Sequence, residues 1–556
     1  MMPVTCSNPW CQASFEVFPE DREFLNKFGI EKDPEECPDC RHQKRGMFYP
    51  QLTFHRRTSS LSGEPMLSIY SERCRFPVYS ISEWWSDRYD ALTYGRLFDF
   101  TRSFFGQFEI LWQEVPQMAN EQDGNTENAD YSFSAGNSKN VYYSVVVYRS
   151  EEMYYCERTT GYNTMLFDCL KCYRCSQLYE CVQCRNCYSS SFLHQCIETR
   201  DSHFCIDCRG CSDCLFCCNL RNKSFHIGNT PYAKEEYERL KTQFINGKYA
   251  THLQNLERWK ELRARTIWRN LWNENSENCR GDALTNCANC YECYHCQNAE
   301  NDRYCRMLTP SEKNVSSMDL TTGGIGELLY NSIGLGGGNY FLRMCVFCRQ
   351  CSDLTYCIHC YSCRDCFGCT GLKSKRYCIL NKQFTKEEYE KFVPIIIANM
   401  KMSGEWGQFF PVSFTPFAYN ESFAMIVSPL TKEEILRRGW RWEDPPELLE
   451  GIPSIDDVAD SIDDVSDDIC KKVLTSTISG KKHKIIPQEL AFYRSMRIPI
   501  PREHPDERMA RRRGMMNPYR LWTRACSKCG KAMETSFSPQ RLEIVYCESC
   551  YLQTVY

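Results

Sequence analysis

Cysteines at the two ends of the chain have the spacing of metal ligands. Near the C-terminus one Cys-x-x-Cys pair follows another after a short spacer, and near the N-terminus a wider pair precedes Cys-Pro-Asp-Cys. Four thiolates on two such knuckles suit tetrahedral Zn²⁺, the alternative being free buried thiols. We predict about two zinc ions per chain, each worth on the order of 10 kcal/mol to its small module. The predicted ligands are Cys6, Cys11, Cys37, Cys40, Cys526, Cys529, Cys547 and Cys550.

The middle of the chain holds most of the other cysteines, out of 39 in all, at a different spacing. From Cys169 to Cys217 each cysteine follows the last at a multiple of three positions. A helix turns about 300° over three positions and a strand changes face, so neither keeps such a row on one side. A second and longer period, four times the first or slightly more, runs through the same stretch. Together the periods predict a β-solenoid. Each coil would hold either one unit of about 12 residues or two such units.

Two segments of this stretch recur later in the chain, which predicts two solenoid arrays. The related segments are 205–237 with 357–389, at an offset of 152, and 137–156 with 286–305, at an offset of 149. Ser144 in the first array becomes Cys293 in the second. Such an exchange favours a ladder of small buried side chains over metal ligation by the array cysteines. Metal or cluster binding and redox chemistry remain the alternatives.

The boundaries of the arrays carry helix and loop signals. Thr230 before Pro231 predicts a helix start, with interrupted helix to about Trp272, and Thr385 with Glu388 predicts a capping box. The glycine-rich stretch 321–338 predicts a flexible loop, because no Gly-Lys-Ser/Thr follows that would make it a phosphate loop. Apolar residues between Glu83 and Glu114 predict one or two amphipathic helices packed on a ribbon or a solenoid end.

The two ends of the chain are related to each other at an offset of 467 or 468. In the N-terminal copy the second cysteine set is replaced by Ser59, Ser62, Ser80 and Glu83. In the C-terminal copy the first set has lost its cysteines, leaving His504 and Glu507, which we interpret as surface residues. One ancestral module with two zinc sites would account for both ends, each keeping a different site.

These motifs resemble a known group of proteins. Phe-x-Val-Phe with Cys-Pro-Asp-Cys-Arg, Glu83-Trp84-Trp85-Ser86-Asp87, the Lys-Glu-Glu-Tyr segments and Tyr546-Cys547-Glu548-x-Cys550 are similar to those of an uncharacterised cysteine-rich zinc-ribbon family of small-genome uncultured bacteria. The resemblance covers most of the chain. It implies zinc binding and no activity.

Basic residues lie among aromatic residues beside both terminal cysteine sets. Phosphate contacts combined with base stacking would suit such a mixture, so it predicts a nucleic-acid interface. The alternative is a basic face that packs on the acidic stretch 456–468. The predicted nucleic-acid-binding residues are Arg508, Arg511, Arg512, Arg513, Arg520, Arg524, Arg41, Lys44, Arg45, Arg56 and Arg57.

Composition bounds the class of protein. A net charge of −4 gives no general field for polyanions, and no stretch approaches the length of a membrane span. The reduced cysteines required by the terminal sites and the absence of a signal segment predict a cytoplasmic protein. No metal-hydrolase spacing, nucleophile elbow or dinucleotide fingerprint occurs, so we expect no enzyme activity and no catalytic residues.

The sequence therefore predicts a mainly β, multidomain protein with helical linkers. The predicted segments are a zinc-ribbon module (1–82), an amphipathic helical segment (83–120), the first array (125–230), a helical linker (231–273), the second array (277–383), a helix with an acidic linker (384–470) and a second zinc-ribbon module (471–556). The predicted function is a non-enzymatic zinc-binding scaffold for RNA or a ribonucleoprotein. The alternatives are a scaffold for a protein partner, and metal storage or redox chemistry by the array cysteines.

Overall fold

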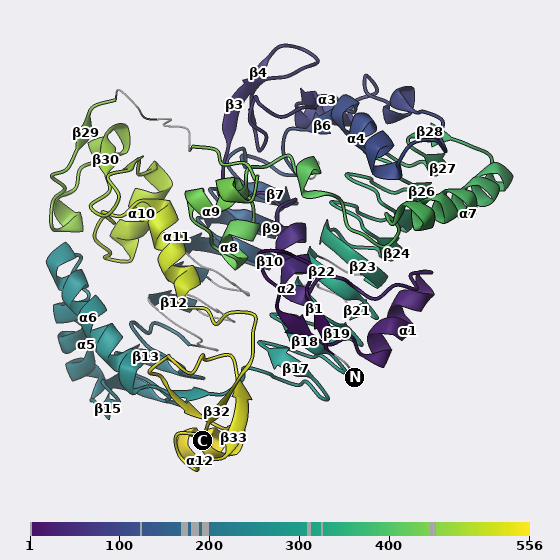
Figure 1. Ribbon diagram of the computed structural model, residues 1–556. Helices are drawn as coiled ribbons and strands as arrows, with labels where there is room; N and C mark the ends of the chain where they lie inside the picture. Colours follow the sequence, from purple (N-terminus) through teal and green to yellow (C-terminus); the bar gives the residue numbers. More distant parts are fainter. Residues whose placement is uncertain are drawn as a thin grey trace. The chain divides into compact units, whose positions relative to one another are not determined.

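The computed structural model describes residues 3–122, 125–167, 176–179, 188–191, 199–308, 313–323, 326–444, 449 and 452–556. The chain forms two compact units, each built from two separate stretches (Figure 1). Unit 1 is Met1–Glu121 with Trp272–Asp444, and unit 2 is Gln122–Leu271 with Pro445–Tyr556. Each unit therefore combines one chain end with the array from the other half of the chain. The fold is mostly sheet with several helices.

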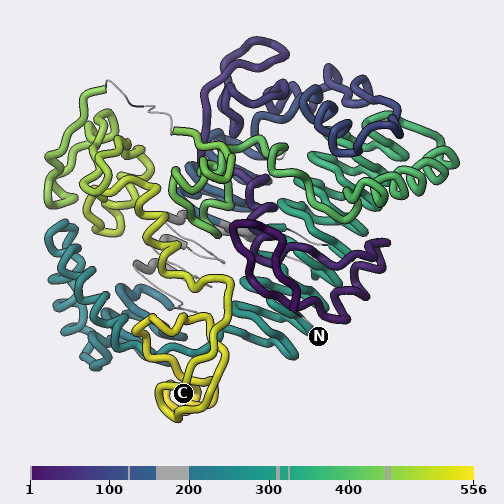
Figure 2. The backbone as a smooth tube through the Cα atoms, in the orientation of Figure 1, coloured from purple at the N-terminus to yellow at the C-terminus, as the bar shows by residue number. Residues whose placement is uncertain are grey.

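Unit 1 contains a long sheet whose strands run parallel and follow one another at short intervals (Figure 2). Ser352 pairs with Arg364, which pairs with Arg376, so neighbouring strands repeat at the longer period of the sequence. The strands are β17 (Arg280–Asp282), β18 (Tyr291–Tyr294), β20 (Arg306–Leu308), β22 (Met318–Gly323), β23 (Gly326–Leu335), β24 (Asn339–Arg343), β25 (Ser352–Thr355), β26 (Arg364–Phe367) and β27 (Arg376–Ile379), with β19 (Ala299–Glu300) and β21 (Asn314–Val315) beside them.

Unit 2 contains the matching parallel array. It has the same register, since Ser212 pairs with Ser224 and Ser176 with Tyr188. The strands are β7 (Phe133–Gly136), β8 (Lys139–Tyr142), β9 (Val145–Tyr154), β10 (Glu157–Phe167), β11 (Ser176–Tyr179), β12 (Tyr188–Ser191), β13 (Ser212–Leu215) and β14 (Ser224–Ile227). Several cysteines that established the short period lie outside the described residues, namely Cys169, Cys172, Cys175, Cys181, Cys184, Cys187 and Cys196.

Left-handed backbone at every third position explains the cysteine period. The residue before each of the five cysteines from Cys205 to Cys217 has a φ between 50° and 62°. Each such residue turns the chain, so every third side chain is directed to the same side. All five cysteines are buried in one cluster with Val147 and Met153. The period is thus a property of the turns, which is why neither a helix nor a regular strand accounts for it.

Each array ends in a short antiparallel strand followed by a helix. In unit 1, β28 (Lys382–Gln383) precedes α7 (Lys386–Ser403), and Thr385 with Glu388 forms the predicted capping box. In unit 2 the predicted helix start is wrong. Thr230 and Pro231 form β15 (Thr230–Pro231), an edge strand paired with β14, where the missing proline N–H is tolerated. The helices that follow are α5 (Lys234–Phe244) and α6 (Tyr249–Arg265).

The prediction of a flexible loop over 321–338 is also wrong. Most of that stretch belongs to β22 and β23, where Leu320 pairs with Ser332 in the same register as the rest of the array. Glycine is needed there for local reasons. At Gly334 φ is +67° and an added Cβ would lie 2.6 Å from the Phe347 ring.

The two ends of the chain fold into modules with the same order of elements. Their hairpins coincide when the ends are aligned at the predicted offset, since β3 begins at His55 and β32 at Trp522. The N-terminal module contains β1 (Val4–Thr5), β2 (Ser14–Phe15), α1 (Pro19–Lys27), α2 (Pro38–Gly46), β3 (His55–Thr58), β4 (Pro65–Ser68), β5 (Val78–Tyr79) and α3 (Ile81–Trp85). The C-terminal module contains β30 (Val473–Thr475), β31 (Lys482–His483), α10 (Pro487–Ser495), α11 (Pro505–Gly514), β32 (Trp522–Ala525), β33 (Ala532–Thr535), β34 (Ile544–Tyr546) and α12 (Glu548–Val555).

Helical segments cover the array of unit 1. The predicted aromatic segment forms α3 and α4 (Phe104–Glu114), and the Phe104 ring lies 5.1 Å from that of Tyr356 in the array. Short helices follow α7, namely α8 (Ala424–Val427) and α9 (Lys432–Arg437). In the described part of the chain no helix has the length and apolar character needed to cross a membrane.

Candidate metal centres

The N-terminal module brings four cysteines together. The Sγ atoms of Cys6, Cys11, Cys37 and Cys40 all lie within 4.8 Å of one another. Cys6 and Cys11 come from the loop between β1 and β2, and Cys37 is the N-cap residue of α2. The backbone N–H of Cys37 donates to Cys6 Sγ at 3.3 Å, and Asn8 Nδ2 donates to Cys40 Sγ at 3.2 Å. The structure therefore gathers into one cluster the four residues that the sequence groups as ligands.

The C-terminal module builds the same arrangement from the other predicted set. Cys526, Cys529, Cys547 and Cys550 lie within 4.8 Å of one another, with the first pair on the turn between β32 and β33. Cys547 is the N-cap residue of α12, and its backbone N–H donates to Cys526 Sγ at 3.2 Å. In both clusters three cysteines are buried and one is exposed.

The distances between sulfur atoms fit a tetrahedral thiolate site. Metal–sulfur bonds of about 2.3 Å at tetrahedral angles place neighbouring sulfurs about 3.8 Å apart, whereas a disulfide needs about 2.05 Å. The Sγ atoms of Cys11 and Cys37 are 3.8 Å apart, as are those of Cys529 and Cys547. N–H groups directed at sulfur favour the thiolate form that a metal requires. Each cluster therefore has the donor set and spacing to hold one metal ion.

The local electrostatics favour a thiolate at some members of each cluster, whereas hydrogen bonding to a neighbouring sulfur raises the pKa of Cys40 and Cys550. A hydrogen bond from Cys40 lowers the pKa of Cys37 to about 6. Burial raises the pKa of Cys526, but backbone N–H groups, those of Cys529 and Cys547 foremost, outweigh it and bring the pKa to about 6. A lowered pKa means that less work is needed to deprotonate the sulfur on metal binding.

The residues that replace cysteine in the N-terminal module also converge. Ser59 Oγ donates to Glu83 Oε2, and the backbone N–H of Ser80 donates to the same oxygen at 2.9 Å. Ser80 is the N-cap of α3 and forms a capping box with Glu83. Burial raises the pKa of Glu83, but hydrogen bonds, from the Ser59 and Ser62 hydroxyls foremost, hold it at about 2. We call Ser59, Ser62, Ser80 and Glu83 the serine–glutamate quartet of unit 1.

The C-terminal module has a corresponding serine–glutamate quartet, made of Ser476, Ser479, His504 and Glu507. Ser476 Oγ donates to Glu507 Oε2 at 2.6 Å, and the His504 backbone N–H donates to the same oxygen at 2.9 Å. The prediction that His504 and Glu507 are surface residues is wrong, because both are half-buried at the start of α11. Sequence reasoning missed Ser476 and Ser479, although Ser-x-x-Ser-Gly has the spacing of Cys526-x-x-Cys529-Gly.

Three of the four sites share one knuckle geometry. The glycine after each pair has a left-handed φ, 78° at Gly63 and 74° at both Gly480 and Gly530. Each glycine N–H donates to the carbonyl of the first residue of the pair, at 2.9 to 3.0 Å. In all four sites the third member is a helix N-cap and the fourth lies three positions later. Candidate metal ligands and hydrogen-bonding residues thus occupy equivalent positions at the helix starts.

Most of the basic residues predicted to bind nucleic acid are buried or bonded to other groups of the protein. Arg41, Arg45, Arg508 and Arg512 are buried, so they present no guanidinium to a phosphate. Lys44 pairs with Glu36, Arg511 with Glu503 and Arg513 with Glu157, while Arg57 and Arg524 donate to backbone carbonyls. Of the predicted set, only Arg56 and Arg520 have exposed side chains with no polar partner in the described structure. Arg494 and Arg497 pair with Asp467 and Asp463, as the alternative of an acidic stretch against a basic face expects.

The array cysteines make hydrogen bonds as thiols. Burial raises the pKa of Cys357 well above its usual range, and Cys357 Sγ donates to the Thr355 carbonyl at 3.5 Å and to the Cys366 carbonyl, on the neighbouring strand, at 3.5 Å. Ser138 makes the same two kinds of contact through its hydroxyl, to Gly136 and Val147. Within the described residues, the terminal clusters alone bring three or more candidate ligands within 4.8 Å of one another. These observations favour the packing interpretation of the arrays.

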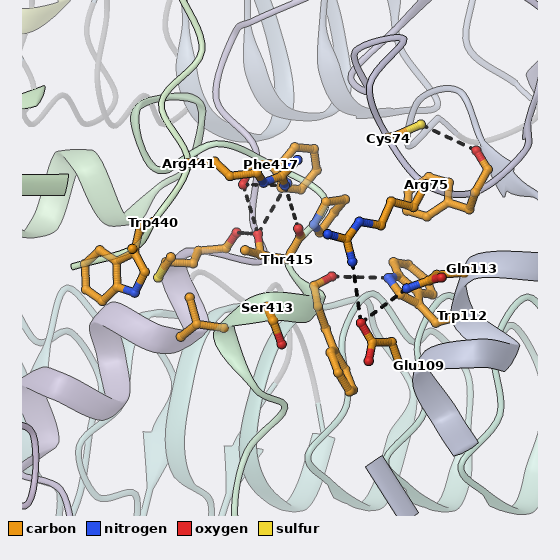
Figure 3. A pocket seen from close by; sticks show the side chains of 16 residues that line it. Cys74, Arg75, Glu109, Trp112, Gln113, Ser413, Thr415, Phe417, Trp440 and Arg441 are labelled. Atoms are coloured by element: carbon orange, nitrogen blue, oxygen red, sulfur yellow. Dashed lines mark hydrogen bonds and ion pairs between the residues drawn. The ribbon is translucent and has the colours of Figure 1, made fainter. Parts of the chain in front are cut away.

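Unit 1 also contains a cavity of about 330 Å³ that sequence reasoning did not anticipate (Figure 3). Its aromatic walls include Trp112, whose indole N–H donates to the Phe414 carbonyl at 3.2 Å. Arg75 faces Glu109 at 3.7 Å, and Arg441 donates to the carbonyls of its own wall. The charged groups are thus directed at the protein, which gives the cavity no evident ligand chemistry.

Comparisons with protein-family models, curated proteins and solved structures give no match. The zinc-ribbon resemblance therefore rests on the sequence motifs alone.

Proposed function

We propose that this chain is a non-enzymatic zinc-binding scaffold built from two units, each a terminal module docked on a cysteine-lined β-solenoid. The observation that carries the proposal is the pair of four-cysteine clusters with sulfur atoms 3.8 Å apart. Thiolates alone, with no position left for water or substrate, are typical of structural rather than catalytic zinc. When bound, the metal supplies a cross-link between a knuckle and a helix start.

The parallel register supports the solenoid part of the proposal. Strand after strand pairs with the next at a constant interval along the chain, as for Leu354 with Cys366 and Cys366 with Cys378. A coil of this length, with a left-handed turn at every third position, would direct every third side chain inward. The matching contacts of the two units also support descent from one module-and-array unit.

The intramolecular contacts of the basic residues favour a protein partner over RNA for the scaffold. A surface that reads phosphates needs free cationic side chains, and of the predicted set Arg56 and Arg520 fit that need. We expect no salt-sensitive retention on immobilised RNA at physiological ionic strength. Retention that is lost in the Arg56→Glu, Arg520→Glu double variant would reinstate RNA as the partner.

Cobalt loading tests the metal part of the proposal. Co²⁺ added anaerobically to metal-free, reduced protein should bind at two equivalents and give the intense absorption of tetrahedral thiolate coordination. Zn²⁺ should displace it and abolish the absorption, because zinc binds such sites more tightly. Weak, six-coordinate cobalt spectra, or binding far above two equivalents, would contradict two structural four-thiolate sites.

A further inference from the structure

The residue after each quartet is buried against an array. Arg41, Trp84, Arg508 and Tyr551 follow the fourth members Cys40, Glu83, Glu507 and Cys550, and their exposed fractions are 7%, 0%, 1% and 1%. Each of the four is the fourth residue of its helix, counted from the residue after the N-cap. The quartets therefore fix the direction in which four equivalent side chains leave their helices. We call these residues the anchors.

In unit 1 both anchors contact the second array. Arg41 Nε pairs with Asp319 Oδ2 at 2.8 Å, and Asp319 is a fully buried residue of β22, which lies beside α2 (Figure 1). The Trp84 ring packs edge-to-face on Tyr361 at 5.4 Å. Lys373 Nζ lies 5.2 Å from the centre of the Trp84 ring and donates to the Trp84 carbonyl at 2.8 Å.

In unit 2 the anchors contact the first array in the same way. Tyr551 donates its hydroxyl to the buried Asp207, and Arg221 pairs with Asp207 at 3.2 Å and lies over the Tyr551 ring. Arg221 corresponds to Lys373 at the offset of 152. The Arg508 guanidinium lies 5.0 Å from the centre of the Tyr155 ring. Tyr155 in turn donates to Glu489, the partner of Arg508.

The helix starts behind these anchors are held in two different ways. Ser80 with Glu83, and His504 with Glu507, form complete capping boxes. Cys37 and Cys547 are N-caps with no side-chain hydrogen bond to the helix. An uncapped helix as short as α2 or α12 is marginal by itself, so something else must hold its first turn. In the cysteine clusters the other knuckle contacts it through N–H to sulfur hydrogen bonds, Cys37 N–H to Cys6 Sγ and Cys547 N–H to Cys526 Sγ, and a shared metal ion would add the strongest link between them.

We infer that metal binding at the cysteine clusters controls the seating of Arg41 and Tyr551 in the arrays, while the seating of Trp84 and Arg508 is metal-independent. The inference rests on the proposed zinc sites. Loss of metal then frees one half of each module, the half that contains α2 in unit 1 and the half that contains α12 in unit 2. The other half stays docked through its serine–glutamate quartet.

Hydrogen exchange of the full reduced chain tests this coupling. We expect chelation to speed exchange around the four contact sites unequally. Protection should fall near Asp319 and Asp207, by at least tenfold in exchange rate, and stay unchanged around Tyr361 and Tyr155. The variants Arg41→Met and Tyr551→Phe should reproduce the loss at Asp319 and Asp207 respectively while the metal stays bound.

The outcomes separate the inference from the proposed function. If the purified protein carries no metal, the proposed function is wrong. If the amides near Asp319 are nevertheless fully protected from exchange in that metal-free protein, the coupling between metal and anchor is wrong as well. Metal that leaves without any change near Asp319 and Asp207 overturns the coupling alone. Equal loss at all four contacts also contradicts it, because the serine–glutamate quartets should not respond to a chelator.

Discussion

Units 1 and 2 hold the same kind of module with the two kinds of quartet exchanged. In unit 1 the first quartet is cysteine and the second is serine–glutamate, whereas in unit 2 the order is reversed. The helix N-cap position of the third member and the buried anchor are alike in all four quartets. A carboxylate bonded to hydroxyls can thus stand where four thiolates stand elsewhere. The comparison indicates that the quartets have a structural role. A carboxylate that accepts hydrogen bonds and a cysteine set that could bind a metal have no reactivity in common, but both can hold a helix start in place.

The largest difference should appear when a cysteine cluster is broken. Cys40→Ser and Cys526→Ser should each remove one metal and destabilise the module that carries it by up to about 10 kcal/mol. Calorimetry combined with hydrogen exchange would show which unit loses stability. Cys470→Ser, a half-buried cysteine outside both clusters, is the matched control. If both units weaken together in either variant, the two sites are not independent.

Converting a serine–glutamate quartet into a cysteine cluster would test the comparison in the opposite direction. Ser59, Ser62, Ser80 and Glu83 occupy the backbone positions of a cysteine cluster. Replacing all four with cysteine should create a third zinc site with tetrahedral thiolate coordination. Metal analysis of the purified variant should give one more zinc than the parent chain. An unchanged count in a folded variant would show that the backbone positions are not equivalent.

The serine–glutamate quartets should matter less and should not involve metal. Glu83→Gln and Glu507→Gln remove a charge that accepts hydrogen bonds, at a cost of about 1–3 kcal/mol each. Denaturant unfolding would measure the loss, and the metal count should stay the same. Metal released by either variant would mean that the quartets of one module are coupled.

The Glu83 contribution also has a defined pH dependence. Its pKa falls from 4.5 to about 2 on folding, so the native state binds the proton less tightly than the unfolded state. The stabilisation is complete above about pH 5 and is lost as pH falls toward 2. Comparing Glu83→Gln with the parent chain over that range should show the difference in stability shrinking with acid. A constant difference would contradict the assignment.

The smallest effect is expected inside the arrays. Ser144 and Cys293 are related at the offset of 149, and each bonds to the carbonyl two positions before it. Exchanging them, as Ser144→Cys and Cys293→Ser, should change unfolding free energy by less than about 1.5 kcal/mol. Urea unfolding measures this directly. A larger loss in Cys293→Ser, together with a loss of metal, would give the array cysteines a ligand role.

Sequence reasoning worked where the determinant is local. The cysteine clusters could be predicted because each knuckle and each N-cap is a short segment with its own spacing. The two periods of the arrays could be predicted because the cysteines repeat at them, whereas the sequence leaves the number of residues per coil open. The start at Thr230 and the loop over 321–338 failed because strand pairing overrode a local signal.

Sequence reasoning did not foresee the burial of Arg41 and Arg45 because their partners are distant along the chain. Arg41 is buried by Asp319, 278 residues away along the chain, and Arg45 by Asn331, 286 residues away. No local pattern separates such an arginine from an exposed one such as Arg56. Ser476 and Ser479 lacked a signal of their own until the left-handed turn at Gly480 showed the geometry that they share with the other knuckles.

Metal counting tests the central claim most directly. Anaerobically purified parent chain, Cys40→Ser, Cys526→Ser and the double variant should contain about two, one, one and no zinc ions per chain by elemental mass spectrometry. That series would establish two independent four-thiolate sites. A parent chain with no metal, or with four or more ions that persist in the double variant, would contradict the account and move the metal chemistry out of the terminal modules.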